Sequence, residues 1–294
     1  MILFLHKDIY DYKLDYEFTI IAAYLGIHNI NDKIISLLNN SNDASINHNL
    51  LSNMKFYKDI LKSKIIYNLD STRYINVNNE NTKFYSSSSC LIHNPNKNGY
   101  FINIRYVNYY INERGAYLNC DKHIITANRF VEFDQNFKII NDKFFDINFE
   151  DRQYIGIEDI RIFYENDNLR FIGTGYHKNN SIGIVEGEYN LNNAILESRE
   201  LTCAFNNSNC EKNWVFINYN NSTHIIYKWN PLQICKIDEE TQKINLIESK
   251  DMPKIFSHIR GSTCGFNYTK KTTLSNNNND NINITINETE IWFV

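Results

Sequence analysis

The sequence lacks closely spaced cysteines. Its six cysteines are far apart and form no Cys-x-x-Cys pair, which argues against a zinc site or a disulfide framework and favours reduced thiols in the core. The histidines at positions 177, 224 and 258 also lack the spacing of metal ligands. We therefore expect no metal and no other cofactor.

Clustered basic residues and long hydrophobic runs are also missing. The net charge is −4 and the lysines are scattered, whereas a nucleic-acid-binding surface needs clustered positive charge. The longest apolar segment, FTIIAAYLGI, is too short for a membrane span, and the apolar run after Met1 is too short for a signal peptide. We expect no nucleic-acid or membrane partner and a cytoplasmic protein.

The N-terminal part, residues 1–70, has helical periodicity. Phe18, Ile21, Ala22 and Leu25 repeat at the spacing of one helix face. The pattern resumes at residues 34–38 and, after a polar gap, a third helical candidate covers residues 50–63. Two such antiparallel helices form a hairpin of the tetratricopeptide kind, which must pack on another surface to bury its apolar face.

From residue 84 the apolar period changes to two, which is typical of strands. The strand candidates fall into groups of about four that recur along the chain, as in the blades of a β-propeller. No long helical pattern intervenes, so parallel β/α folds are poor competitors, and a β-sandwich is the alternative. The sequence therefore predicts a mainly β protein, a propeller over residues 84–294 whose last blade is truncated.

Three charges interrupt an apolar strand in the segment GIEDIRIF. Alternation along a strand places Asp159 and Arg161 on one face, about 7 Å apart, and Glu158 on the other. The first strand of a propeller blade lines the central channel, where charged groups meet water. We expect Asp159 there, with a group of polar and aromatic neighbours: Ser88, Asn103, Arg105, Tyr176, Lys212, Asn213, Trp214 and Arg260. Glu158 is a further candidate for substrate binding.

A carboxylate ringed by cations and amides suits a sugar bound next to a phosphate, because guanidinium groups grip phosphate oxygens. Structural interpretations stand beside this one. Asp159 and Arg161 could form an ion pair that fixes a strand, and Glu158 could accept bonds from a neighbouring blade. Lys212 and Arg260 could form salt bridges between blades, and Trp214 could belong to the core.

Several segments resemble a known family. GIEDIRIF, EKNWVFI, YKWNPLQI and IRGSTCGF resemble the core of the five-bladed propellers of glycoside hydrolase family 130, the mannoside phosphorylases and related mannosyltransferases. Ile160 stands where that family usually has proline. The segment YEFTIIAAYLG resembles the helical repeats that precede such a propeller in sugar-transferring proteins of giant DNA viruses and some bacteria. If the chain is viral, we expect it in the host cytoplasm or the virion.

The resemblance implies an incomplete five-bladed propeller and inverting phosphorolysis with Asp159 as the proton donor. One carboxylate suffices for this reaction because phosphate is already a nucleophile, whereas inverting hydrolysis needs a second carboxylate to activate water. Arg161, Lys212 and Arg260 would hold phosphate. The reverse reaction would transfer a sugar from a sugar phosphate to an acceptor.

The expected partners are a sugar or glycan, inorganic phosphate or a sugar phosphate, and a separate chain that completes the last blade. Two rival functions are a non-catalytic sugar-binding propeller and a protein-interaction scaffold.

Overall fold

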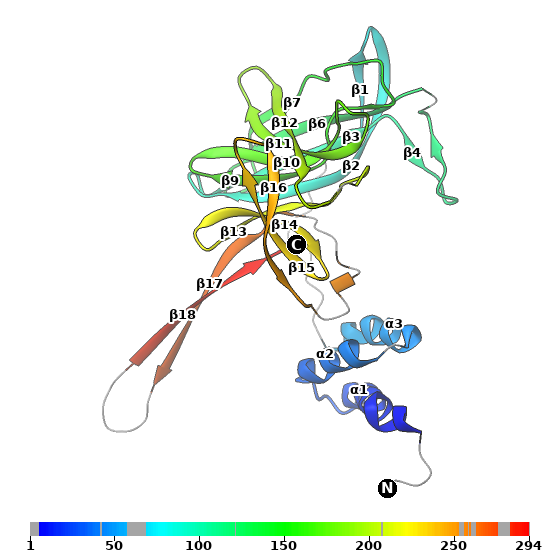
Figure 1. Cartoon of the computed structure of the whole chain (residues 1–294), viewed down its shortest axis with the longest axis vertical. Coiled ribbons are helices and arrows are strands. Elements are labelled where there is room, and N and C mark those ends of the chain that lie inside the picture. The colour runs from blue at the N-terminus through cyan, green and yellow to red at the C-terminus, as the bar shows by residue number, and fades with distance from the viewer. Residues whose placement is uncertain are drawn as a thin grey trace. The chain divides into compact units, whose positions relative to one another are not determined.

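The computed structural model describes residues 6–41, 43–57, 69–120, 122–206, 208–252, 256–257, 259, 263–275 and 283–293. The chain divides into two compact units (Figure 1). The helical unit comprises Met1–Asn68, Trp229–Pro231 and Asp251–Ile259, and the β-rich unit comprises Leu69–Lys228, Leu232–Lys250 and Arg260–Val294. Strands outnumber helices among the described elements, so the prediction of a mainly β protein is confirmed.

The helical unit contains short helices that pack on one another. Its elements are a π-helical turn η1 (Ile9–Lys13), α1 (Leu14–Tyr24), α2 (Asn31–Asn40), α3 (Ala44–Asn53) and a 3-10 turn η2 (Met54–Phe56). Each of the three α-helices contacts the other two. In the described part of the chain, every helix is too short or too polar to cross a membrane.

The third helix begins earlier than its sequence pattern predicts. We expected a helix from residue 50, but α3 starts at Ala44, inside the predicted polar gap. Asp43 caps its first turn by accepting hydrogen bonds from the backbone N–H groups of Ser45 and Ile46. The predicted residues 58–63 of that helix lie outside the described residues.

The buried face of α1 also differs from the prediction. Ala22 is buried as expected, but Phe18, Ile21 and Leu25 are exposed, and Thr19 is buried instead. The Thr19 hydroxyl donates to the Tyr16 carbonyl oxygen at 2.6 Å, which satisfies its buried polar group. Three of the four residues of the predicted apolar stripe are therefore on the surface.

The first sheet of the β-rich unit is an antiparallel meander. Its strands, in spatial order, are β1 (Thr72–Val77), β2 (Glu80–Asn94), β3 (Gly99–Val107), β6 (Ile124–Phe133) and β7 (Ile139–Phe144). The short β8 (Tyr154–Ile155) pairs in parallel with β6. Between β3 and β6, the strands β4 (Tyr110–Ile111) and β5 (Tyr117–Leu118) form a separate hairpin.

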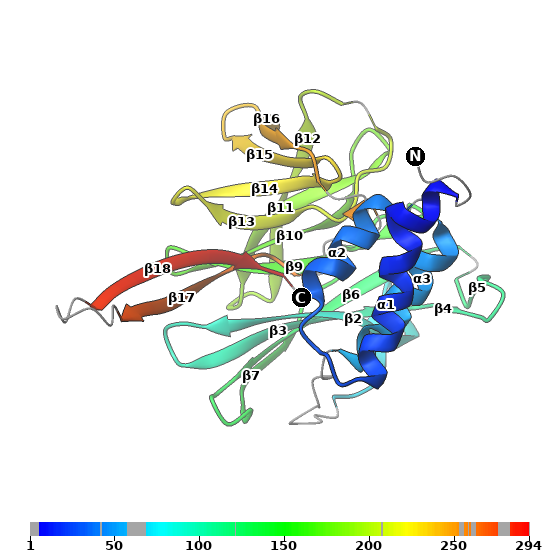
Figure 2. The same ribbon diagram turned by 90° about the horizontal axis from the view of Figure 1, so that it is seen from below.

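The second sheet joins two four-stranded meanders (Figure 2). One contains β9 (Glu158–Glu165), β10 (Asn168–Tyr176), β11 (Ile182–Asn190) and β12 (Ile195–Cys203). The other contains β13 (Val215–Tyr219), β14 (Ser222–Trp229), β15 (Leu232–Asp238) and β16 (Lys243–Lys250). A short parallel contact between β12 and β16 connects them. A third sheet pairs β17 (Phe266–Ser275) with β18 (Asn283–Trp292).

These sheets agree with the predicted groups of about four strands, although β1 lies before the predicted start of the β region at residue 84. The described strands form two large sheets and two hairpins. A five-bladed propeller remains a prediction.

One apolar cluster connects the two large sheets. It contains Phe101 and Phe130 from the first sheet and Ile162, Phe171 and Tyr189 from the second. Phe171 is completely buried and its ring lies edge-on to Tyr189, with 5.3 Å between the ring centroids. Burial of these aromatic rings stabilises the contact between the two sheets.

We predict that Phe171→Ala lowers the free energy of unfolding by about 3–5 kcal/mol, because it leaves a cavity between the sheets. The change is measured by urea denaturation. Tyr74→Ala, at an exposed site on β1, serves as the control and should change stability by less than about 0.5 kcal/mol. Equal losses in the two variants would contradict the assignment of this core.

Candidate functional site

The segment before β9 brings the acidic pair Glu158 and Asp159 close to the first sheet. Tyr154 and Ile155 pair with β6, and Gly156 follows with φ = +89°. A Cβ atom on Gly156 would lie 2.1 Å from the Thr126 carbonyl oxygen. Only glycine permits both this backbone conformation and this close approach. Gly156 therefore sets the direction in which the chain enters β9.

A β-bulge at Asp159 overturns the predicted alternation of the acidic pair. Arg161 pairs with Ile172 and Glu158 with Thr174, so the two residues between them on β9 lie opposite one residue, Gly173. Asp159 has φ = +50°. The extra residue turns both carboxylates towards the same arginine, although alternation predicted opposite faces.

That arginine is Arg105 on β3, whose side chain is only 9% exposed. Its Nη2 lies 3.0 Å from Glu158 Oε1, and its Nη1 donates to Asp159 Oδ1 at 2.9 Å. Nη2 also donates to the Tyr109 hydroxyl at 3.0 Å. Burial acts to lower the pKa of Arg105, but the charges of Glu158 and Asp159 outweigh it and raise the pKa. The guanidinium therefore stays charged and is shared by two carboxylates.

The Asp159 carboxylate is partly available to a ligand. Ser88 Oγ and Arg105 Nη1 both donate to Oδ1, at 3.0 and 2.9 Å. Within the described part of the chain, Oδ2 accepts no hydrogen bond, and the side chain is 33% exposed. Arg161 acts on the backbone: its buried Nη1 donates to the Asp159 carbonyl oxygen at 2.8 Å and so stabilises the bulge.

Two predicted site residues are buried in the interior. The Asn103 amide donates to Asn128 Oδ1 at 2.9 Å and accepts from the Tyr189 hydroxyl at 3.1 Å. Asn128 in turn donates to the Ile157 carbonyl oxygen. Asn103 therefore stabilises the start of β9 indirectly, through Asn128. Trp214 is 2% exposed and packs edge-on against Tyr227. It is a core residue and offers no stacking surface.

The remaining predictions have different outcomes. Asn213 takes a left-handed backbone with φ = +65°, which asparagine tolerates, and it does not line the cavity described next. Arg260 lies outside the described residues. Lys212 and Glu158 do reach that cavity.

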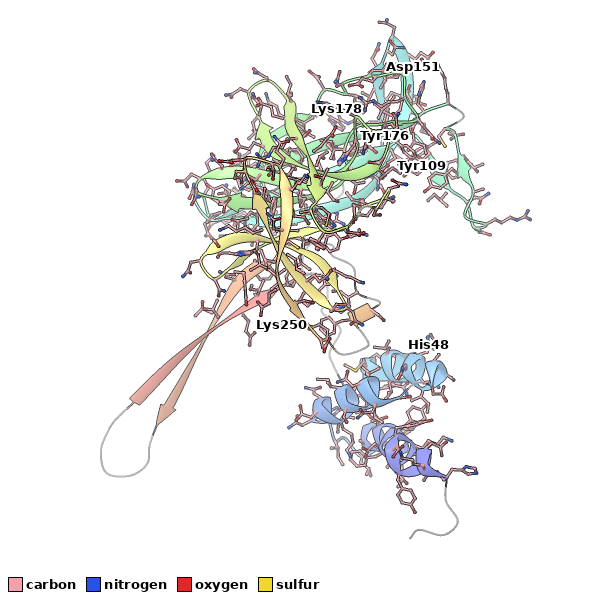
Figure 3. All side chains as sticks on the ribbon, viewed as in Figure 1. His48, Tyr109, Asp151, Tyr176, Lys178 and Lys250 are labelled. Atoms are coloured by element: carbon pink, nitrogen blue, oxygen red, sulfur yellow. The ribbon has the colours of Figure 1, made fainter. Side chains whose placement is uncertain are left out.

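A cavity of about 460 Å³ lies beside the acidic pair. Its polar side chains include Glu158 and Lys212, and its aromatic lining residues are Tyr109, Tyr117, Tyr154 and Tyr176. The rings form two pairs, with 4.9 Å between the centroids of Tyr109 and Tyr117 and 5.9 Å between those of Tyr154 and Tyr176. Figure 3 labels one tyrosine of each pair, Tyr109 and Tyr176. We call this space the tyrosine cavity.

The charge of Lys212 is not neutralised by any carboxylate that the structure describes, and its side chain is exposed. A neighbouring cavity of about 550 Å³ shares Tyr154 and Tyr176 but contains none of the predicted charged residues. The tyrosine cavity is therefore the candidate site.

Sequence reasoning identified Tyr176 but missed Tyr109, Tyr117 and Tyr154. Tyr109 lies near the end of a strand candidate and Tyr154 directly before one, whereas Tyr117 lies between two candidates. Tyrosines at such positions indicate a half-buried strand equally well. Only the fold brings them to one cavity. Aromatic faces with one carboxylate and one ammonium group can pack against an apolar ligand face and orient its polar groups.

Comparison with known proteins adds nothing to this geometry, because neither a protein-family model nor a curated protein matches the chain. No three His, Cys, Asp or Glu side chains of the described residues are grouped to hold a metal ion.

The positive φ of Asp159 predicts a specific pattern of stability. Asparagine tolerates the left-handed conformation, whereas alanine does not, so Asp159→Ala should be about 1 kcal/mol less stable than Asp159→Asn. Urea denaturation of both variants measures the difference. The same two changes at Asp146, an exposed residue with ordinary φ, should give nearly equal stabilities. Equal stabilities at position 159 would contradict the bulge.

The shared guanidinium predicts a second effect on stability. Arg105→Gln leaves Glu158 and Asp159 without their cation and should lower the free energy of unfolding by about 3 kcal/mol. Lys122→Gln is the control, because Lys122 and Asp151 are both highly exposed, and such pairs contribute less than about 1 kcal/mol. Thermal and urea unfolding of the two variants compare the losses. A loss at Arg105 no larger than that at Lys122 would show that the carboxylates do not depend on it.

Proposed function

We propose that the protein is a carbohydrate-active enzyme, a glycoside phosphorylase or glycosyltransferase that acts on mannose-like sugars through a sugar 1-phosphate. The reaction inverts the configuration at the anomeric carbon of the sugar, and Asp159 is the general acid. The observation that carries the proposal is the tyrosine cavity, which combines aromatic walls with Glu158, the neighbour of Asp159, and with the ammonium group of Lys212.

The proposed chemistry needs one proton-transferring carboxylate and a cation. In phosphorolysis, a phosphate oxygen attacks the anomeric carbon, and the glycosidic bond breaks with its electron pair moving to the leaving oxygen. Asp159 carries a proton before this step and gives it to that oxygen, and the proton that hydrogen phosphate loses on becoming the sugar phosphate restores the acid. In the reverse direction, the acceptor hydroxyl attacks the sugar 1-phosphate, its proton passes to Asp159, and inorganic phosphate leaves. Lys212 balances the charge of phosphate in both directions.

The arrangement of the strands supports the related proposal of a propeller. β9 contacts β2 and β3, β13 contacts β9, and β17 contacts β13. β9, β13 and β17, the first strands of three successive groups, therefore follow one another in contact, as the first strands of blades do around a propeller axis, and β2 and β3 of the first sheet lie next to β9. Among the described strands, β17 and β18 pair only with each other. A separate chain that adds strands to this hairpin remains part of the proposal.

A non-catalytic sugar-binding protein is the second candidate. Two observations favour it: both carboxylates of the acidic pair bind Arg105, and Asp159 itself does not line the tyrosine cavity. In this case the acidic pair shapes the cavity and the tyrosines bind the sugar without chemistry.

One assay separates the two candidates. The protein is incubated with mannose 1-phosphate and a panel of acceptor sugars, and released phosphate is measured. If Asp159 is the general acid, Asp159→Asn should reduce the rate at least about 100-fold. Asp142→Asn, which removes a carboxylate from Arg129 instead, should retain most of the activity.

Phosphate release that survives Asp159→Asn would overturn the assigned role. Absence of release, combined with saturable thermal stabilisation by sugars, would select the binding protein. Absence of both effects would reject a carbohydrate function.

A further inference from the structure

The β4–β5 hairpin is an excursion that the first sheet does not need. β3 and β6 pair directly, and Val107 lies opposite Thr126 at the open end. Residues 108–120 leave the sheet between these strands, and residues 122–123 lead back to it (Figure 1). The connection between β9 and β10, by contrast, contains only Asn166 and Asp167. A long ordered connection between neighbouring strands usually serves a ligand or partner.

The hairpin is fixed at its base and at its tip. Asn108 closes the base: its amide donates to the His123 carbonyl oxygen, and its Oδ1 accepts from the Ile125 N–H, both at 2.8 Å. Asn112 orders the tip by accepting from the backbone N–H groups of Arg114 and Ala116. These hydrogen bonds therefore hold the backbone of the hairpin at both ends.

Two tyrosines of this excursion line the tyrosine cavity. Tyr117 is 53% exposed, so its ring is not needed for a core and one part of it is available to a ligand. Tyr109 is buried at the base of the hairpin, against Tyr117 on one side and Arg105 on the other. The pair thus connects the cavity wall with the guanidinium that holds the acidic pair.

The Tyr109 hydroxyl is oriented by its hydrogen bond. Its oxygen accepts from Arg105 Nη2 at 3.0 Å, so its own proton points away from the guanidinium. Burial, with a further contribution from the charge of Glu158, raises the pKa of Tyr109. The hydroxyl therefore keeps its proton at neutral pH and remains a hydrogen-bond donor.

We propose that the β4–β5 hairpin determines which ligand the tyrosine cavity accepts, by recognising the sugar ring and not the phosphate. The ring of Tyr117 packs against the C–H face of a pyranose, and the Tyr109 hydroxyl donates a hydrogen bond to a ring substituent. This inference rests on the proposed function and extends it, because it divides recognition between the hairpin and Lys212.

The test measures binding to the whole chain by calorimetry, with mannose 1-phosphate, mannose and inorganic phosphate as probes. Tyr117→Leu removes the aromatic face and should raise the Kd for mannose 1-phosphate about tenfold. Tyr109→Phe keeps the ring, removes the hydroxyl and should raise it by a similar factor. Neither change should alter the Kd for inorganic phosphate more than about twofold.

Two further variants serve as controls. Tyr117→Trp keeps an aromatic face and should keep mannose 1-phosphate binding close to that of the unmodified protein. Tyr110→Leu changes an exposed tyrosine of the same hairpin that does not line the cavity, and it should leave every Kd unchanged. If Tyr109→Phe lowers the thermal midpoint, the two variants of the exposed Tyr117 decide the question.

The outcomes separate this inference from the proposed function. If the unmodified protein binds mannose 1-phosphate and Tyr117→Leu and Tyr109→Phe bind it equally well, the hairpin inference is wrong and the proposed function stands. Equal losses of mannose 1-phosphate and inorganic phosphate would also overturn it, because they would indicate a general collapse of the cavity. If the unmodified protein binds neither mannose nor mannose 1-phosphate, both proposals fail together.

Discussion

The site depends on one buried charge, the guanidinium of Arg105. A buried cation is tolerated only if anions and hydrogen-bond acceptors surround it. Glu158 and Asp159 supply the anions, and the Tyr109 hydroxyl supplies a neutral acceptor. These partners come from β9 and from the connection after β3, so the requirement to neutralise one side chain holds the second sheet and the β4–β5 excursion against the first sheet.

This requirement explains the bulge in β9. A regular strand would present only one of two consecutive carboxylates to Arg105. The inserted residue and the left-handed conformation of Asp159 present both. Aspartate tolerates that conformation better than most residues, and Gly173 leaves space opposite, where a Cβ atom would lie 2.7 Å from Ile157 Cγ2. The pairing of the charges with Arg105 offsets the strain of the Asp159 backbone. Backbone strain that the surrounding structure offsets in this way is frequent at functional sites.

The sequence predicted the parts of this fold that depend on periodicity. The strands around Ile162 and Phe171 and the helix α2 follow from apolar spacing. Features set by tertiary contacts were missed or misplaced. The bulge depends on Arg105, fifty-four residues before Asp159 in the chain. Thr19 is buried because α1 packs against α2 and α3. The cavity was predicted only through Glu158, Lys212 and Tyr176, since tyrosines at strand edges have no sequence pattern that distinguishes a ligand wall from a core.

The same geometry imposes a condition on any catalytic role of Asp159. Its Oδ1 is engaged by Ser88 and Arg105, so chemistry has to use Oδ2, the oxygen that no described residue binds. Asp159 does not line the tyrosine cavity but its neighbour Glu158 does, so catalysis by Asp159 requires that a reacting oxygen reach beyond the lining residues. A sugar held against Tyr117 and fixed by Tyr109 would be placed close to Arg105, the residue that also holds Asp159. Arg105 would in this way position both the sugar, through Tyr109, and the acid, Asp159. A ligand that does not contact the hairpin would lack the alignment that proton transfer requires.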